Sequence, residues 1–219
     1  MLGTACGGRI VTTTSSPLGP PPAATPAAPA AGARAAAVRR LPWAWPVAIL
    51  VGFPIGGLVA NLIVGKVETA AAALAGGLIA GGIIGAAQWL ALRPLVPGLW
   101  VVATSVGMAA GLTVGAALVD YGISRADLVV MGAITGLGVG GLQALLLGPR
   151  VSGAVWWAVL NPAAWALAWL VTSFVITSSV KEHFTNFGAG GALLFALMTW
   201  VLLRFLFQAN EGEGEPRER

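Results

Sequence analysis

Six long stretches of this 219-residue chain carry almost no charged side chain. Each is close to the ~20 residues that an α-helix needs to cross the hydrocarbon core of a bilayer. Only 9% of the residues are charged, against about 25% in an ordinary soluble domain. The sequence therefore predicts an all-α, polytopic membrane protein. The six expected transmembrane helices cover residues 43–64, 71–92, 99–119, 128–147, 154–178 and 187–207.

One motif recurs in the second, fourth and sixth of these stretches. It consists of three small residues spaced four apart, followed three positions later by a polar residue. On an α-helix such residues fall within an arc of roughly 80° and form one smooth face. The three copies are Gly77, Gly81, Gly85 and Gln88, then Gly132, Gly136, Gly140 and Gln143, and finally Gly188, Ala192, Ala196 and Thr199.

The small residues predict close helix packing, because they let transmembrane backbones approach each other. We interpret the glycines as contacts between helices of one chain. Two alternatives remain, a seam between copies of a homo-oligomer and a pore lined by smooth surfaces.

The recurrence also predicts three repeats of a two-helix hairpin. Trp45, Trp100 and Trp156 begin the three units, which cover about 42–97, 98–152 and 153–208. Each unit crosses the membrane twice, so all three enter from the same side and are parallel repeats. We expect a pseudo-threefold arrangement within one six-helix domain spanning 42–208.

The two ends of the chain have different compositions from this domain. Residues 1–41 are rich in Ala and Pro, and residues 209–219 are charged. Neither segment has enough apolar surface to offset the entropy of ordering. Both are expected to be disordered tails.

Charge predicts the orientation. Seven basic residues fall on the side of the N-terminus, whereas three fall on the opposite side together with acidic residues. Basic residues favour the cytoplasm, so we expect both termini inside the cell. Tryptophans cluster near the same interface, where indoles commonly anchor a protein at the headgroup level. They are Trp43, Trp45, Trp89, Trp100, Trp156, Trp157 and Trp200.

Gln88, Gln143 and Thr199 are the candidate functional residues. Three polar groups around a pseudo-axis would form either a closed polar ring or the neck of a pore for a small solute. Asn161 and Pro162 would kink the fifth helix or, alternatively, break it at a substrate site.

Other chemistry has little support. No Asp, Glu, Lys or His falls at an expected bilayer midplane, where ion-coupled transporters place such groups. The single histidine, His183, falls in an external loop, and the single cysteine, Cys6, in the N-terminal tail. Carboxylate pairs, nucleophilic triads and metal-ligand spacings are absent from the spans. We therefore expect no enzymatic activity, no cofactor, no metal and no nucleic-acid partner.

Residues 81–93 and 99–107 resemble a group of uncharacterised bacterial multi-pass membrane proteins. Those proteins repeat a G-x3-G-x2-Q-W-L-x-L-R element followed by a helix that begins with Trp. The resemblance covers about 45–204, with departures at Ala144, Gly148 and Thr199. It implies the fold and a location in the bacterial inner membrane, and no activity.

Together these observations favour a non-enzymatic structural or interaction component of the bacterial cytoplasmic membrane. The partners would be the lipid bilayer and a second protein or another copy of the chain. The alternative is a small channel or uniporter for an uncharged solute, with the three polar residues at its neck.

Overall fold

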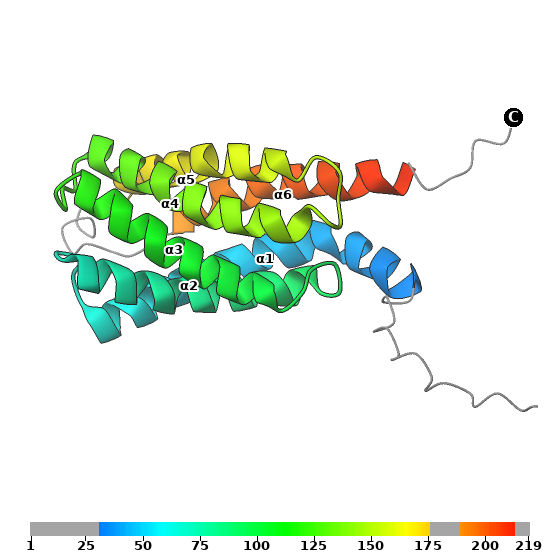
Figure 1. The fold of residues 1–219 in the computed structure, drawn as a ribbon, viewed down its shortest axis with the longest axis horizontal. Helices are drawn as coiled ribbons and strands as arrows, with labels where there is room; N and C mark the ends of the chain where they lie inside the picture. The colour runs from blue at the N-terminus through cyan, green and yellow to red at the C-terminus, as the bar shows by residue number, and fades with distance from the viewer. Residues whose placement is uncertain (1–30, 176–188, 213–219) are drawn as a thin grey trace, which may run out of the picture.

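The computed structural model describes residues 31–175 and 189–212. These residues form six α-helices and no strand (Figure 1). The helices are α1 (Ala31–Val64), α2 (Ala70–Leu92), α3 (Leu99–Leu118), α4 (Arg125–Leu147), α5 (Val155–Val175) and α6 (Ala189–Gly212).

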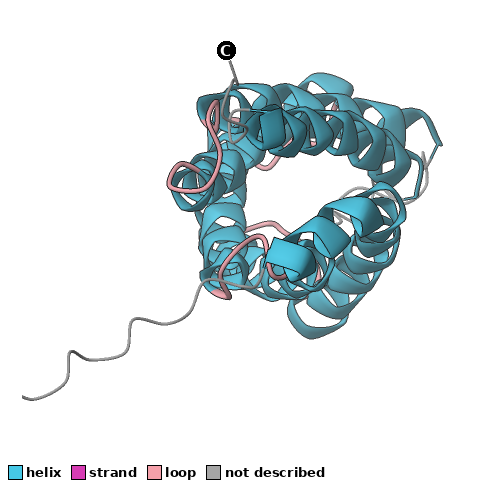
Figure 2. Cartoon of the chain, turned by 90° about the vertical axis from the view of Figure 1, so that its right-hand side faces the viewer, coloured by secondary structure: helices cyan, strands magenta, loops and turns pink. Residues whose placement is uncertain are grey.

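The helices form a closed ring. Each packs against its neighbours in the chain, and α1 also packs against α6. The ring is visible along the bundle axis in Figure 2. Successive helices run in opposite directions, so the start of α1 and the end of α6 lie at the same end of the bundle as the α2–α3 and α4–α5 connections (Figure 1). We call this the terminal end.

Local signals fix several helix boundaries. Thr69 caps α2, because its hydroxyl accepts a hydrogen bond from the backbone N–H of Ala72 at 3.2 Å. Ser124 and Asp127 form a reciprocal capping box at the start of α4. Gly65 follows α1 with a φ of 77°, a conformation that favours glycine over residues with a side chain.

Glycine lets neighbouring backbones approach closely around the ring. A Cβ added to Gly77 would lie 2.6 Å from Ala109 Cα in α3, and one added to Gly111 would lie 2.6 Å from Thr135 Cα in α4. One added to Gly136 would lie 2.7 Å from the backbone oxygen of Asn161 in α5. These distances are shorter than real Cβ contacts, so each position excludes even a methyl group.

Large aromatic side chains fill the centre. Trp45 of α1 and Trp100 of α3 both contact Trp157 of α5, with ring centroids 6.0 and 6.1 Å apart. Farther from the terminal end, Phe53, Trp165 and Phe195 pack together with centroids 5.3–5.5 Å apart. The six-helix ring therefore encloses an aromatic core.

The outer face is apolar. Leu62 in α1, Leu145 in α4 and Val155 in α5 are between 62% and 75% exposed. Five helices, α1 to α5, are long and apolar enough to cross a membrane. These properties are compatible with an integral membrane protein.

The two ends of the helical domain differ from the sequence-based expectation. Residues 31–41, assigned to the N-terminal tail, belong to α1, where Ala37 and Leu41 are buried. At the other end α6 continues to Gly212, into the segment assigned to the C-terminal tail, and its described apolar stretch is Gly191–Phe207. Gly188, His183 and Cys6 lie outside the described residues.

Two glycines of α4, one packed against α5 and one open, test the packing. Gly136→Ala should lower the free energy of unfolding by about 1–3 kcal/mol, because the added methyl group meets the α5 backbone. Gly141→Ala is the matched control, since a Cβ there meets nothing within 4 Å, and it should be neutral or stabilising by up to ~1 kcal/mol. Thermal unfolding in detergent measures both. Equal melting temperatures would contradict the tight α4–α5 contact.

Candidate functional site

Three buried indole N–H groups each donate to a polar side chain on a neighbouring helix. Trp100 Nε1 donates to Gln88 Oε1 at 3.0 Å, and Trp157 Nε1 donates to Gln143 Oε1 at 2.9 Å. Trp45 Nε1 donates to Thr199 Oγ1 at 2.9 Å. In each case a helix of the set α1, α3 and α5 supplies the indole. The helix before it around the ring, α6, α2 or α4, supplies the acceptor.

Gln143 connects two of these pairs. Its Nε2 donates to Gln88 Oε1 at 3.0 Å and to Thr104 Oγ1 at 2.8 Å. Thr104 in turn donates to the backbone oxygen of Trp100. Gln88 and Gln143 come from α2 and α4, which are not neighbours in the ring, so their bond crosses its interior.

Thr199 occupies the third position with a shorter side chain. Its hydroxyl accepts from Trp45 and donates to the backbone oxygen of Phe195. Among the described side chains it has no hydrogen bond to Gln88 or Gln143. The structure thus joins the two amides directly and places Thr199 beside them through the Trp45–Trp157 ring contact.

This network is closed to solvent. Gln88, Gln143 and Thr199 are each 1% exposed, and the three indoles are fully buried. Isolated amides are costly in an apolar interior, whereas hydrogen-bonded ones are tolerated. We refer to Trp45, Trp100, Trp157, Gln88, Gln143 and Thr199 as the tryptophan–amide network.

The tryptophans of the expected interfacial belt separate into three groups. Trp45, Trp100 and Trp157 face the interior, so they are not headgroup anchors. Trp43 and Trp156 are 61% and 51% exposed, which is compatible with that role. Trp156 was also expected to be the third unit's counterpart of Trp45 and Trp100. The neighbouring Trp157 fills that position.

The remaining two tryptophans pair with arginines one helical turn away. The Arg93 guanidinium lies 5.7 Å from the centroid of Trp89, and that of Arg204 lies 5.9 Å from the centroid of Trp200. Both are cation–π arrangements. The W-x3-R spacing in the sequence was a signal for these pairs.

The glycines of the repeated motif lie between neighbouring helices. Gly77, Gly81 and Gly85 face α3. Gly132, Gly136 and Gly140 face α5, including its Asn161–Pro162 segment. Pro162 lies within one continuous helix, and Asn161 Nδ2 donates to the backbone oxygen of Trp157. The alternative of a broken helix at this segment is therefore not what the structure adopts.

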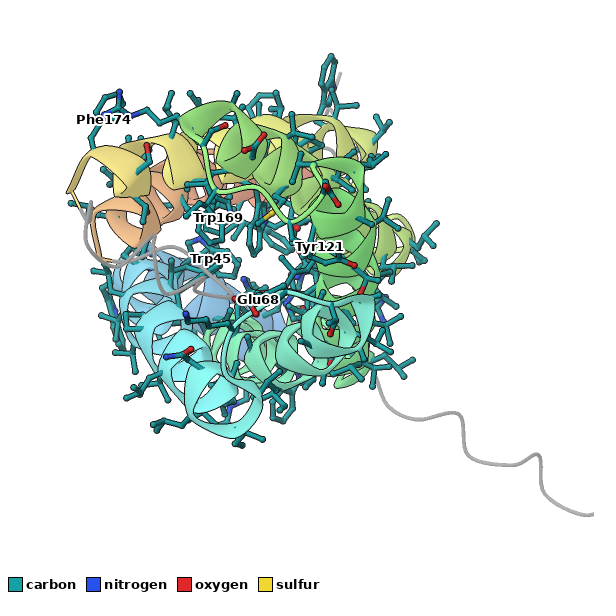
Figure 3. The ribbon with its side chains drawn as sticks, turned by 90° about the vertical axis from the view of Figure 1, so that its left-hand side faces the viewer. Trp45, Glu68, Tyr121, Trp169 and Phe174 are labelled. Carbon is teal, nitrogen blue, oxygen red and sulfur yellow. The ribbon has the colours of Figure 1, made fainter. Side chains whose placement is uncertain are left out.

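Within the described part of the chain, some buried polar atoms have no protein hydrogen-bond partner. They include Thr135 Oγ1, Asn161 Oδ1, Thr172 Oγ1 and Trp200 Nε1. Thr135 and Thr172 lie farther from the terminal end than the tryptophan–amide network, on α4 and α5. At that far end Glu68, Tyr121 and Trp169 lie around the bundle axis (Figure 3).

The described residues contain no group of three or more His, Cys, Asp or Glu side chains that could hold a metal. The fold and interior thus define a class, a closed six-helix bundle with an aromatic, hydrogen-bonded core and an outer face suited to lipid. Comparison of the chain with protein-family models, curated proteins and solved structures gave no match.

Two threonines test the contribution of the network. Thr199→Val removes the acceptor of a buried indole and should cost about 1–2 kcal/mol of unfolding free energy. Thr113→Val is the matched control, because Thr113 Oγ1 donates only to Ala109 O of its own helix. Removing this hydroxyl should leave the unfolding free energy nearly unchanged. If thermal unfolding showed the same loss of stability for Thr199→Val and Thr113→Val, this would contradict a stabilising Trp45–Thr199 bond.

Proposed function

We propose that the chain is a non-enzymatic, multi-pass protein of the bacterial cytoplasmic membrane that acts as a structural or interaction component. The observation that carries the proposal is the closed tryptophan–amide network. Its indole and amide groups bond to one another across a filled interior. A site for turnover or passage would instead keep polar groups available to a substrate or to water.

In this proposal all six helices cross the bilayer. The described apolar part of α6, Gly191–Phe207, would by itself span about 25 Å at 1.5 Å per residue, close to the ~30 Å hydrocarbon thickness. Its place in the ring between α5 and α1 supports the same membrane depth as its neighbours.

The three-hairpin repeat is also part of the proposal. Its support is the cyclic order of the indole bonds, in which each odd-numbered helix donates to the even-numbered helix before it. Gln88 and Gln143 are 55 residues apart, as the sequence repeat requires. The third unit is the divergent one, with Thr199 in place of glutamine.

Charge at the terminal end supports the proposed orientation, with both termini in the cytoplasm. Arg40 and Arg93 lie together there, with the Arg40 guanidinium donating to the backbone oxygen of Arg93 at 3.2 Å. The α4–α5 connection, which contains Arg150, lies at the same end (Figure 1). An excess of Arg supports a cytoplasmic terminal end. The resemblance to bacterial multi-pass proteins agrees with a location in the inner membrane, and a second protein or copy remains the proposed partner.

Cysteine accessibility checks this topology. In a Cys6→Ser background, Glu68→Cys should react in intact cells with a membrane-impermeant thiol reagent, because the α1–α2 connection would be external. Arg150→Cys should react only after the cells are opened. Labelling with the reverse pattern would overturn the proposed orientation.

A channel for an uncharged solute is the second candidate. The observation in its favour is the set of buried polar oxygens without a protein partner, which could hold water in the half of the bundle away from the termini. A continuous path would still have to pass the tryptophan–amide network, whose members are at most 1% exposed.

Liposome swelling separates the two candidates. Liposomes containing the wild-type protein should swell in neutral solutes no faster than empty liposomes. The Gln88→Leu/Gln143→Leu double variant should lose stability, because the indoles of Trp100 and Trp157 lose their acceptors. Solute-selective swelling by the wild type, altered in the double variant, would replace the structural proposal with the channel.

A further inference from the structure

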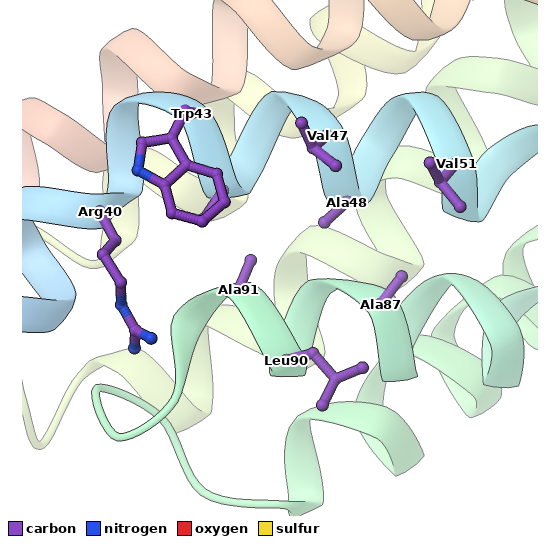
Figure 4. Close-up of a pocket in the computed structure, with 9 residues that line it drawn as sticks. Arg40, Trp43, Val47, Ala48, Val51, Ala87, Leu90 and Ala91 are labelled. Atoms are coloured by element: carbon purple, nitrogen blue, oxygen red, sulfur yellow. The ribbon is translucent and has the colours of Figure 1, made fainter.

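A groove of about 300 Å³ lies on the outside of the bundle between α1 and α2, near the terminal end (Figure 4). Its floor is made of small side chains and its walls of larger apolar ones. One charged residue, Arg40, lies at its end (Figure 4). The lining residues are Arg40, Trp43, Ala44, Val47, Ala48, Val51, Ala87, Leu90 and Ala91.

The helix packing explains the groove. α1 and α2 touch at Gly52, where an added Cβ would lie 2.9 Å from Ala87 Cβ. Toward the terminal end the facing residues are alanines such as Ala48 and Ala91, too small to fill the space between the helices. The exposed side chains of Trp43 and Leu90 stand on either side.

We propose that this groove binds one acyl chain of an anionic phospholipid, with the phosphate of its headgroup on Arg40. The inference rests on the membrane placement proposed above. Apolar walls exclude a polar solute as the occupant, and the groove opens on the face that would meet lipid.

The length of the groove fits a lipid of one leaflet. From Arg40 to Val51 the rise along α1 is about 16 Å at 1.5 Å per residue. Half of a ~30 Å hydrocarbon core is about 15 Å. An acyl chain lying along the groove therefore reaches from the headgroup level to the bilayer midplane.

Charge at the groove end selects the headgroup. The guanidinium of Arg40 uses Nη2 to hold the Arg93 backbone oxygen, and the side chain is otherwise exposed. Arg39, the preceding residue, and Arg93, whose backbone oxygen Arg40 contacts, add positive charge nearby. Guanidinium groups bind phosphate oxygens with charge-assisted hydrogen bonds, and the surrounding positive charge disfavours a headgroup that also carries a cation, such as choline. The indole of Trp43, 61% exposed beside Arg40, suits the same interfacial level.

Native mass spectrometry of the full-length protein in detergent tests this site. The probes are phosphatidylglycerol and phosphatidylcholine with identical acyl chains. The wild type should retain phosphatidylglycerol at least ~5-fold better, which corresponds to about 1 kcal/mol. Arg40→Gln should remove most of this preference.

Two further variants define the location. Arg150→Gln is the control, because Arg150 also donates to a backbone oxygen at the terminal end but lies outside the groove, and it should keep the preference. Ala48→Leu fills the floor and should weaken retention of both lipids. Equal retention of the two lipids, or a preference that survives Arg40→Gln, would overturn the proposal.

Resistance of the same protein to alkaline carbonate extraction from membranes is measured in parallel. Extraction would refute the membrane placement itself. A protein that stays in the membrane without selecting phosphatidylglycerol would refute only the lipid site.

Discussion

Three fully buried indoles donate hydrogen bonds to side chains on neighbouring helices, and these bonds organise the interior. Trp45, Trp100 and Trp157 are fully buried, and each has a side-chain oxygen within 3.0 Å of its Nε1. An unpaired donor there would cost about 1–3 kcal/mol, since water is not at hand to replace the acceptor. The network therefore specifies which helices are neighbours and at what depth they meet.

The hydrogen bonds of the network form only because the helices are close together. Gly111 and Gly136 bring α4 against α3 and α5 with no side chain between the backbones. At that separation the amide of Gln143 reaches both Gln88 and Thr104. Backbone contact and polar contact thus depend on each other, while large apolar side chains are exposed on the outer faces.

The sequence predicted the helices well, because a long apolar stretch has few stable structures other than an α-helix. It also aligned Gln88 with Gln143, which the structure places in direct contact. The partners of these amides were missed, because a tryptophan near a helix end fits a lipid interface as well as a buried site. The separations of 12 and 14 residues from Gln88 to Trp100 and from Gln143 to Trp157, across a short turn, were the available signal. Likewise, Ala37, Leu41 and Trp45 continue one row at intervals of four, although Ala and Pro enrichment indicated a tail.

Closure of the ring by α1 and α6 has a consequence for how the protein is made. The indole of Trp45 and its acceptor on Thr199 are separated by 154 residues, nearly the whole helical domain. A ribosome delivers α1 first and α6 last, so the helix that supplies the native acceptor of the Trp45 indole is the last to be made. Only α6 closes the ring, so a chain that ends before α6 differs from the finished protein in having no Thr199 acceptor for the Trp45 indole.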